Sequence, residues 1–348
     1  MNMPSGSKKI ARRDFLKLSA TGLVGIFFGG LVYPWFKRAQ QPKTNVTILK
    51  ASYYSGNLVD DLRRGVANYP HLQEKVRGGK VVLKPNLVDF YYGHPLSTHP
   101  ALVAAVIEVF QWMGAGEVIV ADGPAHNRDT EMVLELSGTS EVLRRKNIRF
   151  VDLNLDAISP VNLATNFTGL TRLFFPNTIL NADLVVSMPK LKTHHWAGVS
   201  LSLKNMFGVI PGVKYGWPKN FLHWHGIGNS IADIATTIQP GFAIVDGIVG
   251  MEGDGPLYGT AVDSGVVLLG DNLSAVDSTA TRLMGIYAEN IEHLRLMVPY
   301  GGTLNNDRIH QLGEPLSAVQ QNFEVVEIME FVKEKPDLWK RALISGWE

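Results

Sequence analysis

The stretch that decides the fold reads Asn181-Ala-Asp-Leu-Val-Val-Ser-Met-Pro-Lys-Leu-Lys-Thr-His-His-Trp-Ala-Gly-Val-Ser-Leu-Ser-Leu-Lys-Asn205. It begins with the apolar run Leu184 to Met188, which is typical of a buried strand. Pro189 has no N–H to donate, so we expect the strand to stop there and a loop to follow. Cations, imidazoles and an amide come next: Lys190, Lys192, His194, His195, Lys204 and Asn205. This composition favours the floor of a binding site over a solvated basic loop.

Polar clusters also follow the other apolar runs. Five predicted strands end in Lys84-Pro-Asn86, Asp122-Gly-Pro124, Pro189-Lys190, Asp246-Gly247 and Gly270-Asp271. Most are followed by helical patterns, such as residues 100–113, which indicates βαβ units. In such sheets, ligands bind where the carboxyl ends of the strands meet. We therefore predict an α/β fold, a largely parallel sheet flanked by helices, with a ligand cleft at the carboxyl ends of the strands.

Three segments depart from this alternation. Residues 156–175 indicate an irregular excursion with short β pieces. Residues 198–209 fit either a short helix or a glycine-bounded turn, and residues 213–224 indicate a flap over the cleft.

Composition excludes several classes of protein. The 348 residues carry a formal net charge of +1 with no basic stripe, so we expect no nucleic-acid partner. The chain has no cysteine, which excludes disulfides, a thiolate nucleophile and a cysteine-ligated iron–sulfur cluster. The cofactor stays unknown, and a divalent metal, if bound, must be held by His, Asp, Glu, Asn or water.

The amino terminus resembles a twin-arginine export signal. Arg12-Arg13 is followed by one polar residue and then Phe15-Leu16-Lys17, although Ala11 replaces the usual Ser or Thr. We expect residues 1–38 to be this signal, 39–44 a linker and 45–348 one α/β domain. The apolar run 18–33 is shorter than the roughly 20 residues of a relaxed membrane span, so cleavage and retention as an anchor both stay open. The expected partner is the twin-arginine translocase, and the expected location is the periplasm or the outer side of the cytoplasmic membrane.

The basic residues predict a small anionic ligand, a phosphate or a carboxylate. Buried cations must be paired, either by acidic side chains in a salt-bridge network or by an anionic substrate. The glycine-dense segment Gly250 to Pro256 allows close approach of backbone to a ligand. The predicted substrate-binding residues are Lys84, Asn86, Lys190, Lys204, Asn205, Gly253 and Gly255.

The histidines and acids leave two chemistries open. A His/carboxylate metal site would draw on Asp122, His126, Asp246, Glu252 and Asp254, with His223 and His225 as further candidate ligands. A metal-free alternative uses His194 or His195 to move protons beside a lysine. The predicted catalytic residues are His194, His195 and Lys192.

Several motifs occur in an order that resembles a known family: Lys84-Pro-Asn-Leu87, Thr98-His-Pro100, Ala121-Asp-Gly-Pro124, Ala182 to His194, Ser202-Leu-Lys-Asn205, Val245-Asp-Gly-Ile248 and Gly250 to Pro256. They resemble the prokaryotic domain-of-unknown-function family 362 over roughly residues 45–290. The resemblance implies one domain. Many members carry cysteine-rich ferredoxin-like segments, and this association does not transfer to a chain without cysteine. The sequence thus predicts an exported enzyme acting on a small anion, with or without a metal, or a non-catalytic periplasmic binding protein.

Overall fold

The computed structural model describes residues 43–54, 56–124, 129–216 and 219–337, and from Thr44 onward these form one compact unit. The predicted twin-arginine signal, apolar run and most of the linker lie outside the described residues. Within those that are described, no helix has the length and apolar character that a bilayer crossing requires.

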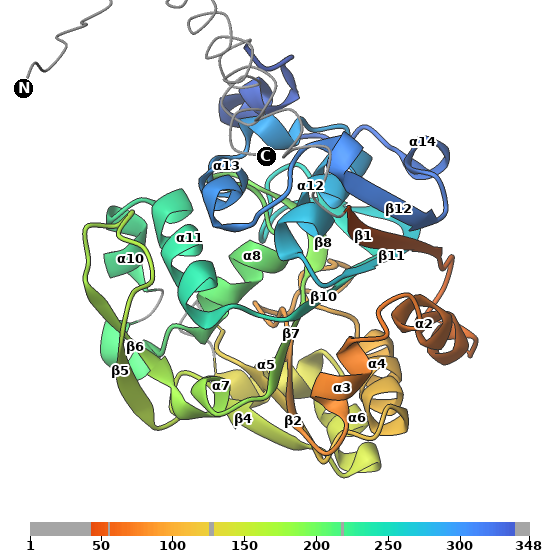
Figure 1. The fold of residues 1–348 in the computed structure, drawn as a ribbon, viewed down its shortest axis with the longest axis vertical. Helices are drawn as coiled ribbons and strands as arrows, with labels where there is room; N and C mark the ends of the chain where they lie inside the picture. Colours follow the sequence, from red (N-terminus) through yellow and green to blue (C-terminus); the bar gives the residue numbers. More distant parts are fainter. Residues whose placement is uncertain (1–42, 55, 125–128, 217–218, 338–348) are drawn as a thin grey trace, which may run out of the picture. The chain divides into compact units, whose positions relative to one another are not determined.

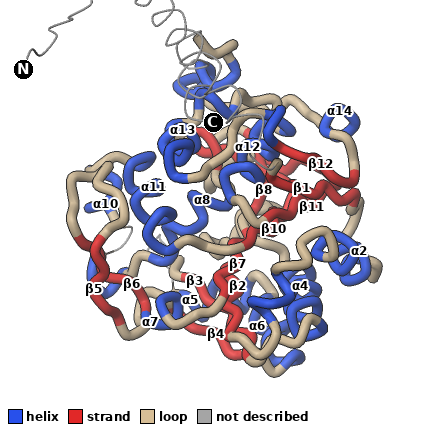
Figure 2. Tube along the Cα trace, in the orientation of Figure 1, coloured by secondary structure: helices blue, strands red, loops and turns tan. Residues whose placement is uncertain are grey.

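One large sheet organises the unit (Figures 1 and 2). Its strand order is β12 (Ile309–Gly313), β1 (Thr44–Lys50), β11 (Thr260–Gly270), β10 (Phe242–Glu252), β7 (Leu184–Met188), β2 (Lys80–Pro85), β3 (Glu117–Asp122) and β4 (Arg149–Asp152). The pairs from β10 through β7, β2 and β3 to β4 are parallel, and β11 pairs antiparallel with both β10 and β1. The predicted α/β fold with a largely parallel sheet is confirmed.

Helices cover both faces of the sheet (Figure 1). One layer contains α2 (Leu58–Val66), α3 (Leu72–Val76), α4 (Pro100–Trp112), α5 (Thr130–Leu136) and α6 (Thr139–Lys146). The other contains α8 (Ser202–Asn205), α11 (Ile227–Ile238), α12 (Leu273–Leu283) and α13 (Glu292–Met297). Alternate residues of strand β2 pack against the two layers: Val81 and Leu83 face the first layer, and Val82 faces the second.

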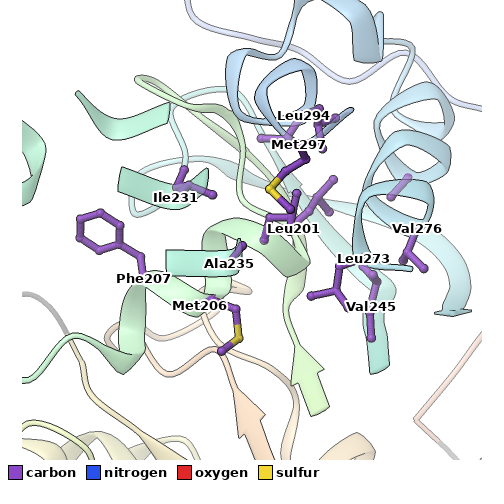
Figure 3. Close-up of a cluster of buried hydrophobic side chains, with 14 of the residues drawn as sticks. Leu201, Met206, Phe207, Ile231, Ala235, Val245, Leu273, Val276, Leu294 and Met297 are labelled. Carbon is purple, nitrogen blue, oxygen red and sulfur yellow. The ribbon is translucent and has the colours of Figure 1, made fainter. Parts of the chain in front are cut away.

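The second apolar layer fixes the segment that follows the deciding stretch. Figure 3 shows Leu201, Met206 and Phe207 packed with side chains of α11, α12 and α13. Asp277 of α12 accepts hydrogen bonds from the backbone N–H groups of Ser202 and Leu203, both at 2.8 Å. This carboxylate therefore caps the start of α8 from a neighbouring helix.

The chain does not leave the sheet at Pro189, so the expected loop is wrong. It continues as β8 (Lys190–His194), which pairs with β10 and with β9 (Gly198–Val199). Pro189 lacks an N–H, but its carbonyl accepts a hydrogen bond from the Asp246 N–H at 2.8 Å. The pairing with β10 therefore continues past Pro189 with a shift in register.

The three irregular segments have these structures. The predicted excursion is a two-stranded sheet of β5 (Ile158–Asn162) and β6 (Arg172–Pro176), followed by α7 (Asn177–Leu180). Residues 198–209 contain β9, α8 and a 3-10 helix (Met206–Val209), so of the two alternatives the structure has the short helix. The expected flap contains α9 (Gly212–Tyr215) and α10 (Asn220–Trp224). Further carboxyl-terminal elements are α14 (Leu316–Val319) and 3-10 helices at Ala288–Asn290, Val298–Tyr300, Asn306–Arg308 and Glu327–Lys333.

Candidate active site

A cavity of about 270 Å³ lies where the carboxyl ends of β2, β3 and β8 meet. Its lining comes from segments far apart in the sequence: Lys84, Asn86, Leu87, Asp122, His194, His195, Trp196, Lys204, Asn205, Phe207, Gly208, His223, Leu257 and Tyr258, among others. The cavity therefore lies at the sheet edge where the sequence placed the ligand cleft.

A buried ion pair forms one side of the cavity. The Lys84 ammonium lies 2.6 Å from the Asp122 carboxylate, and both side chains are almost fully enclosed. The second carboxylate oxygen accepts the Leu87 N–H at 2.6 Å. A Cβ atom on Gly208 would lie only 2.6 Å from the Lys84 Nζ and 2.7 Å from an Asp122 oxygen. Glycine at 208 is therefore what lets the backbone pass over this pair.

Asn205 braces the same ion pair. Its side-chain oxygen accepts a hydrogen bond from the Lys84 ammonium at 3.1 Å, and its amide donates to the Lys84 carbonyl at 3.0 Å. Asn86 differs, because its side-chain oxygen is buried at the cavity with no hydrogen-bond partner among the described residues. Of these two predicted substrate-binding residues, Asn86 thus has a side-chain oxygen that could accept a hydrogen bond from a ligand. The Asn205 amide is instead hydrogen-bonded to Lys84.

Lys204 is a cation of the cavity lining for which the described residues supply no carboxylate partner. It lines the cavity, and its Nζ lies 4.8 Å from the centroid of the Phe207 ring. Burial, with a contribution from the nearby charge of Lys84, lowers the pKa of Lys204 to about 8. His293 beside it supplies no charge, because burial lowers its pKa to about 3. At neutral pH, Lys204 therefore brings an uncompensated positive charge to the cavity.

His194 is held as a neutral hydrogen-bond donor. Its Nδ1 accepts the backbone N–H groups of Trp196 at 3.1 Å and Ala197 at 3.3 Å. Because an N–H can only donate, this nitrogen carries no proton, and the proton of the neutral ring is on Nε2. Burial, reinforced by the charge of Lys204, lowers the pKa of His194 well below its usual range. These contacts favour His194 as a donor to a ligand over the base that the sequence suggested.

His195 has the surroundings of a base. Its Nδ1 lies 3.2 Å from the Asp254 carboxylate, and both side chains are partly exposed. An ionised carboxylate only accepts hydrogen bonds, so Nδ1 donates, and Nε2 of the neutral ring has no hydrogen-bond partner among the described residues. Asp254 thus orients His195, as a carboxylate orients the histidine in a catalytic triad.

Lys190 and Lys192 lie outside the cavity lining. The Lys190 ammonium binds Asp246 at 2.8 Å and the Tyr54 hydroxyl at 2.9 Å. Lys192 is fully buried and donates to the Leu96 carbonyl at 2.8 Å. The substrate-binding role predicted for Lys190 and the catalytic role predicted for Lys192 thus find no support in their contacts.

Each predicted metal ligand in the described residues contacts a different partner in the protein. Asp122 pairs with Lys84, Asp246 with Lys190, and Asp254 with His195, while Glu252 accepts the Glu324 N–H at 2.9 Å. His126 lies outside the described residues. His223 lines the cavity, whereas the Nδ1 of His225 contacts the Thr168 carbonyl at 3.0 Å. Within the described part of the chain, no three His, Asp or Glu side chains converge to hold a metal ion.

Gly253 and Gly255 serve the backbone instead of a ligand. Gly253 has a φ of +77°, and its carbonyl accepts the Thr193 hydroxyl at 2.9 Å. A Cβ on Gly255 would lie 2.1 Å from the Thr193 carbonyl oxygen. The close approach that the glycines predicted is real, but the partner is β8. Through it, the loop carrying Asp254 reaches His195.

The comparisons with known proteins decide the family. A family model described as a domain of unknown function (DUF362) matches residues 81–282, more than half of the chain. This chain is a DUF362 protein. The resemblance given by the sequence motifs is thereby confirmed at the level of the family.

Individual relatives of this DUF362 protein are more distant. It is 27% identical over 297 residues to the thylakoid-associated protein sll1697 of Synechocystis, covering 82% of this chain and 88% of that protein. It is similar to the lactate racemase apoprotein of Thermoanaerobacterium thermosaccharolyticum, with 15% identity, 66% of this chain and 54% of that chain covered, and a TM-score of 0.41. A Thermotoga maritima protein matches 57% of this chain and 52% of its own at 15% identity and a TM-score of 0.32. The DUF362 chain thus spans about half the length of these two structures.

Sequence reasoning missed several residues of the DUF362 site. Lys219 is fully buried and donates to the carbonyls of Gly123 at 3.0 Å and Gly208 at 3.4 Å, and burial lowers its pKa to about 7. It follows no strand, so no pattern marked it. Trp196 and Tyr258 line the cavity although both are mostly exposed. Trp196 was visible beside the two histidines, whereas Tyr258 follows the glycine-dense loop without a motif of its own.

Proposed function

We propose that this cavity is an active site that binds a small phosphate or carboxylate and carries out acid–base chemistry on it. The observation that carries the proposal is Lys204, which lines the cavity with no carboxylate partner among the described residues. A partly buried cation that has no carboxylate partner among the described residues is costly, and an anion in the cavity would supply the missing charge. The oxygen atoms of phosphates and carboxylates match this requirement.

Three side chains would each have a separate role in the reaction. Lys204 holds the anion, and the Nε2–H of His194 donates a hydrogen bond to an oxygen on which negative charge develops. His195 takes a proton from the substrate on Nε2, and Asp254 stabilises the imidazolium that forms. The buried Lys84–Asp122 pair fixes the shape of the site and moves no proton in this scheme.

Calorimetric titration with inorganic phosphate and with acetate tests the anion site. The unmodified protein should bind at least one of them, and Lys204→Met should weaken that binding tenfold or more, because it removes a lining cation that has no carboxylate partner among the described residues. Lys214→Met is a matched control: Lys214 also lies over a phenylalanine ring, 4.6 Å from the centroid of Phe174, but it does not line the cavity. Equal affinity in the Lys204→Met variant would contradict the proposal.

Solvent deuterium incorporation into a panel of small carboxylates separates an enzyme from a binding protein. An enzyme should incorporate deuterium, and His195→Gln should abolish incorporation while leaving anion affinity within about threefold. Binding with no incorporation, and no hydrolysis of phosphate or carboxylate esters, would instead support a non-catalytic accessory protein.

We also propose export by the twin-arginine translocase, with membrane association through residues 18–33. Arg12-Arg13 and the apolar run that follows support it. In a bacterium with this translocase, the double change Arg12→Lys and Arg13→Lys should leave the protein in the cytoplasm. The control Lys8→Gln and Lys9→Gln keeps the arginine pair and should still be exported. Export of the lysine variant would argue against this route.

A further inference from the structure

The cavity lining has two chemical zones. Lys84, Asp122 and His194 are almost fully buried, so they form the inner end. Trp196 and Tyr258 line the same cavity, yet they are 60% and 67% exposed, which places them where it opens to solvent. The zones are therefore a charged inner end and an aromatic mouth.

Apolar walls connect the two zones. Leu87, Phe207 and Leu257 are buried and line the cavity, and the Phe207 ring lies 4.8 Å from the Lys204 ammonium. An anion held by Lys204 would thus have an apolar wall directly beside it. A fully polar ligand gains nothing from that wall, whereas an apolar group attached to the anion buries its surface there.

Trp196 is held in place by its neighbours. Its ring meets the ring of His195 edge-on, with centroids 5.2 Å apart, and that of His223 at 5.5 Å. A single exposed aromatic side chain needs no explanation. Two of them on one cavity, with one positioned by the same histidine that we propose as the base, offer a preorganised surface for a flat apolar group.

We infer that the ligand is an organic anion with an aromatic group: a phosphate or carboxylate head at Lys204 and an aryl group against the rings of Trp196 and Tyr258 at the mouth of the cavity. This inference rests on the proposed function, because it takes the anion site as given. The cavity volume of about 270 Å³ agrees, being close to the lower end of the range for small-molecule sites, roughly 300 Å³, and generous for a bare phosphate or acetate ion.

The test compares matched pairs of probes on the full chain by calorimetry: phenyl phosphate against inorganic phosphate, and benzoate against acetate, with benzyl alcohol as the neutral aromatic. In whichever pair binds, the aryl member should bind at least tenfold more tightly because it buries a ring. Trp196→Ala should reduce that affinity roughly threefold to tenfold, and should therefore narrow the difference in affinity between the aryl anion and the small anion of the same pair. Trp224→Ala is the control, since Trp224 is exposed and does not line the cavity.

The outcomes separate the two proposals. Equal affinity within each pair, or an aryl preference that survives Trp196→Ala unchanged, overturns the aromatic ligand and leaves the anion site standing. No binding by any of the four anions overturns both. Benzyl alcohol binding as tightly as the aryl anions, with no loss in Lys204→Met, overturns the anion site.

Discussion

Lys204 has a charge that depends on pH within an accessible range. Burial and Lys84 lower its pKa to about 8, so the ammonium is largely present at pH 7 and largely absent at pH 9. Because only the protonated form attracts an anion, affinity should be highest below pH 8 and fall as pH rises above it.

Sulfate is a suitable probe for this pH dependence, because its charge is constant over the range. Its affinity should fall by up to about tenfold for each pH unit above 8, since a bound anion itself raises the pKa of Lys204 and moderates the fall. Lys204→Arg keeps the charge at every pH used and should flatten the profile between pH 7 and 9.5. A fall of the same size in the arginine variant would assign the titration to another group.

Asp122 is the residue whose loss should cost most stability. Asp122→Asn removes the charge beside a fully buried Lys84 and leaves a nearly isosteric amide, so unfolding free energy should fall by about 3–5 kcal/mol at pH 7. Urea unfolding measures the change. Glu135→Gln provides the control, because the Arg144–Glu135 pair is exposed and should contribute less than about 1 kcal/mol.

Among the elements, α8 connects the apolar layer to the site. It is a single turn that begins on the Asp277 carboxylate and ends at Lys204 and Asn205. Such a short helix has little stability of its own, so its position depends on the cap and on the apolar contacts shown in Figure 3.

Asp277→Ala should therefore affect both folding and binding. It leaves two buried N–H groups without acceptors, which predicts a loss of roughly 2–5 kcal/mol in unfolding free energy and weaker anion binding through a displaced Lys204. Asp277→Asn keeps one acceptor and should lie between the alanine variant and the unmodified protein in urea unfolding. An alanine variant with unchanged stability would show that α8 is held by its apolar contacts alone.

Strand β8 could not be predicted from the sequence pattern alone, which favoured a loop after Pro189. Pro189 cannot donate a hydrogen bond to a neighbouring strand, but its carbonyl still accepts one from the backbone N–H of Asp246. The sequence shows that a proline lacks an N–H. It does not show which neighbouring strand donates to the proline C=O, because tertiary structure decides that. His194 and His195 therefore lie at the end of a second strand instead of in a loop.

Across the whole molecule, the sequence correctly predicted that β2 and β3 end at the site, but the predicted strand ends Asp246-Gly247 and Gly270-Asp271 do not line the cavity, and β11 runs antiparallel to β10. Lys84, Asp122 and His194 meet in one cavity because parallel strands bring their carboxyl ends together. Lys190 begins β8 and Asp246 lies within β10, and the two side chains bind each other and Tyr54 away from the cavity. The amino-acid composition gives only the numbers of lysines and acidic residues. The side-chain contacts show that Lys204 has no carboxylate partner among the described residues.

Crystals of the full chain soaked in tungstate test whether Lys204 holds an anion in the cavity, because tungsten locates a phosphate-like anion by its anomalous scattering. We predict a peak in the cavity within hydrogen-bonding distance of the Lys204 Nζ and the His194 Nε2, and no such peak in Lys204→Met crystals. An empty cavity with Lys204 paired to a protein carboxylate, or the same peak in the methionine variant, would contradict an anion site built on Lys204.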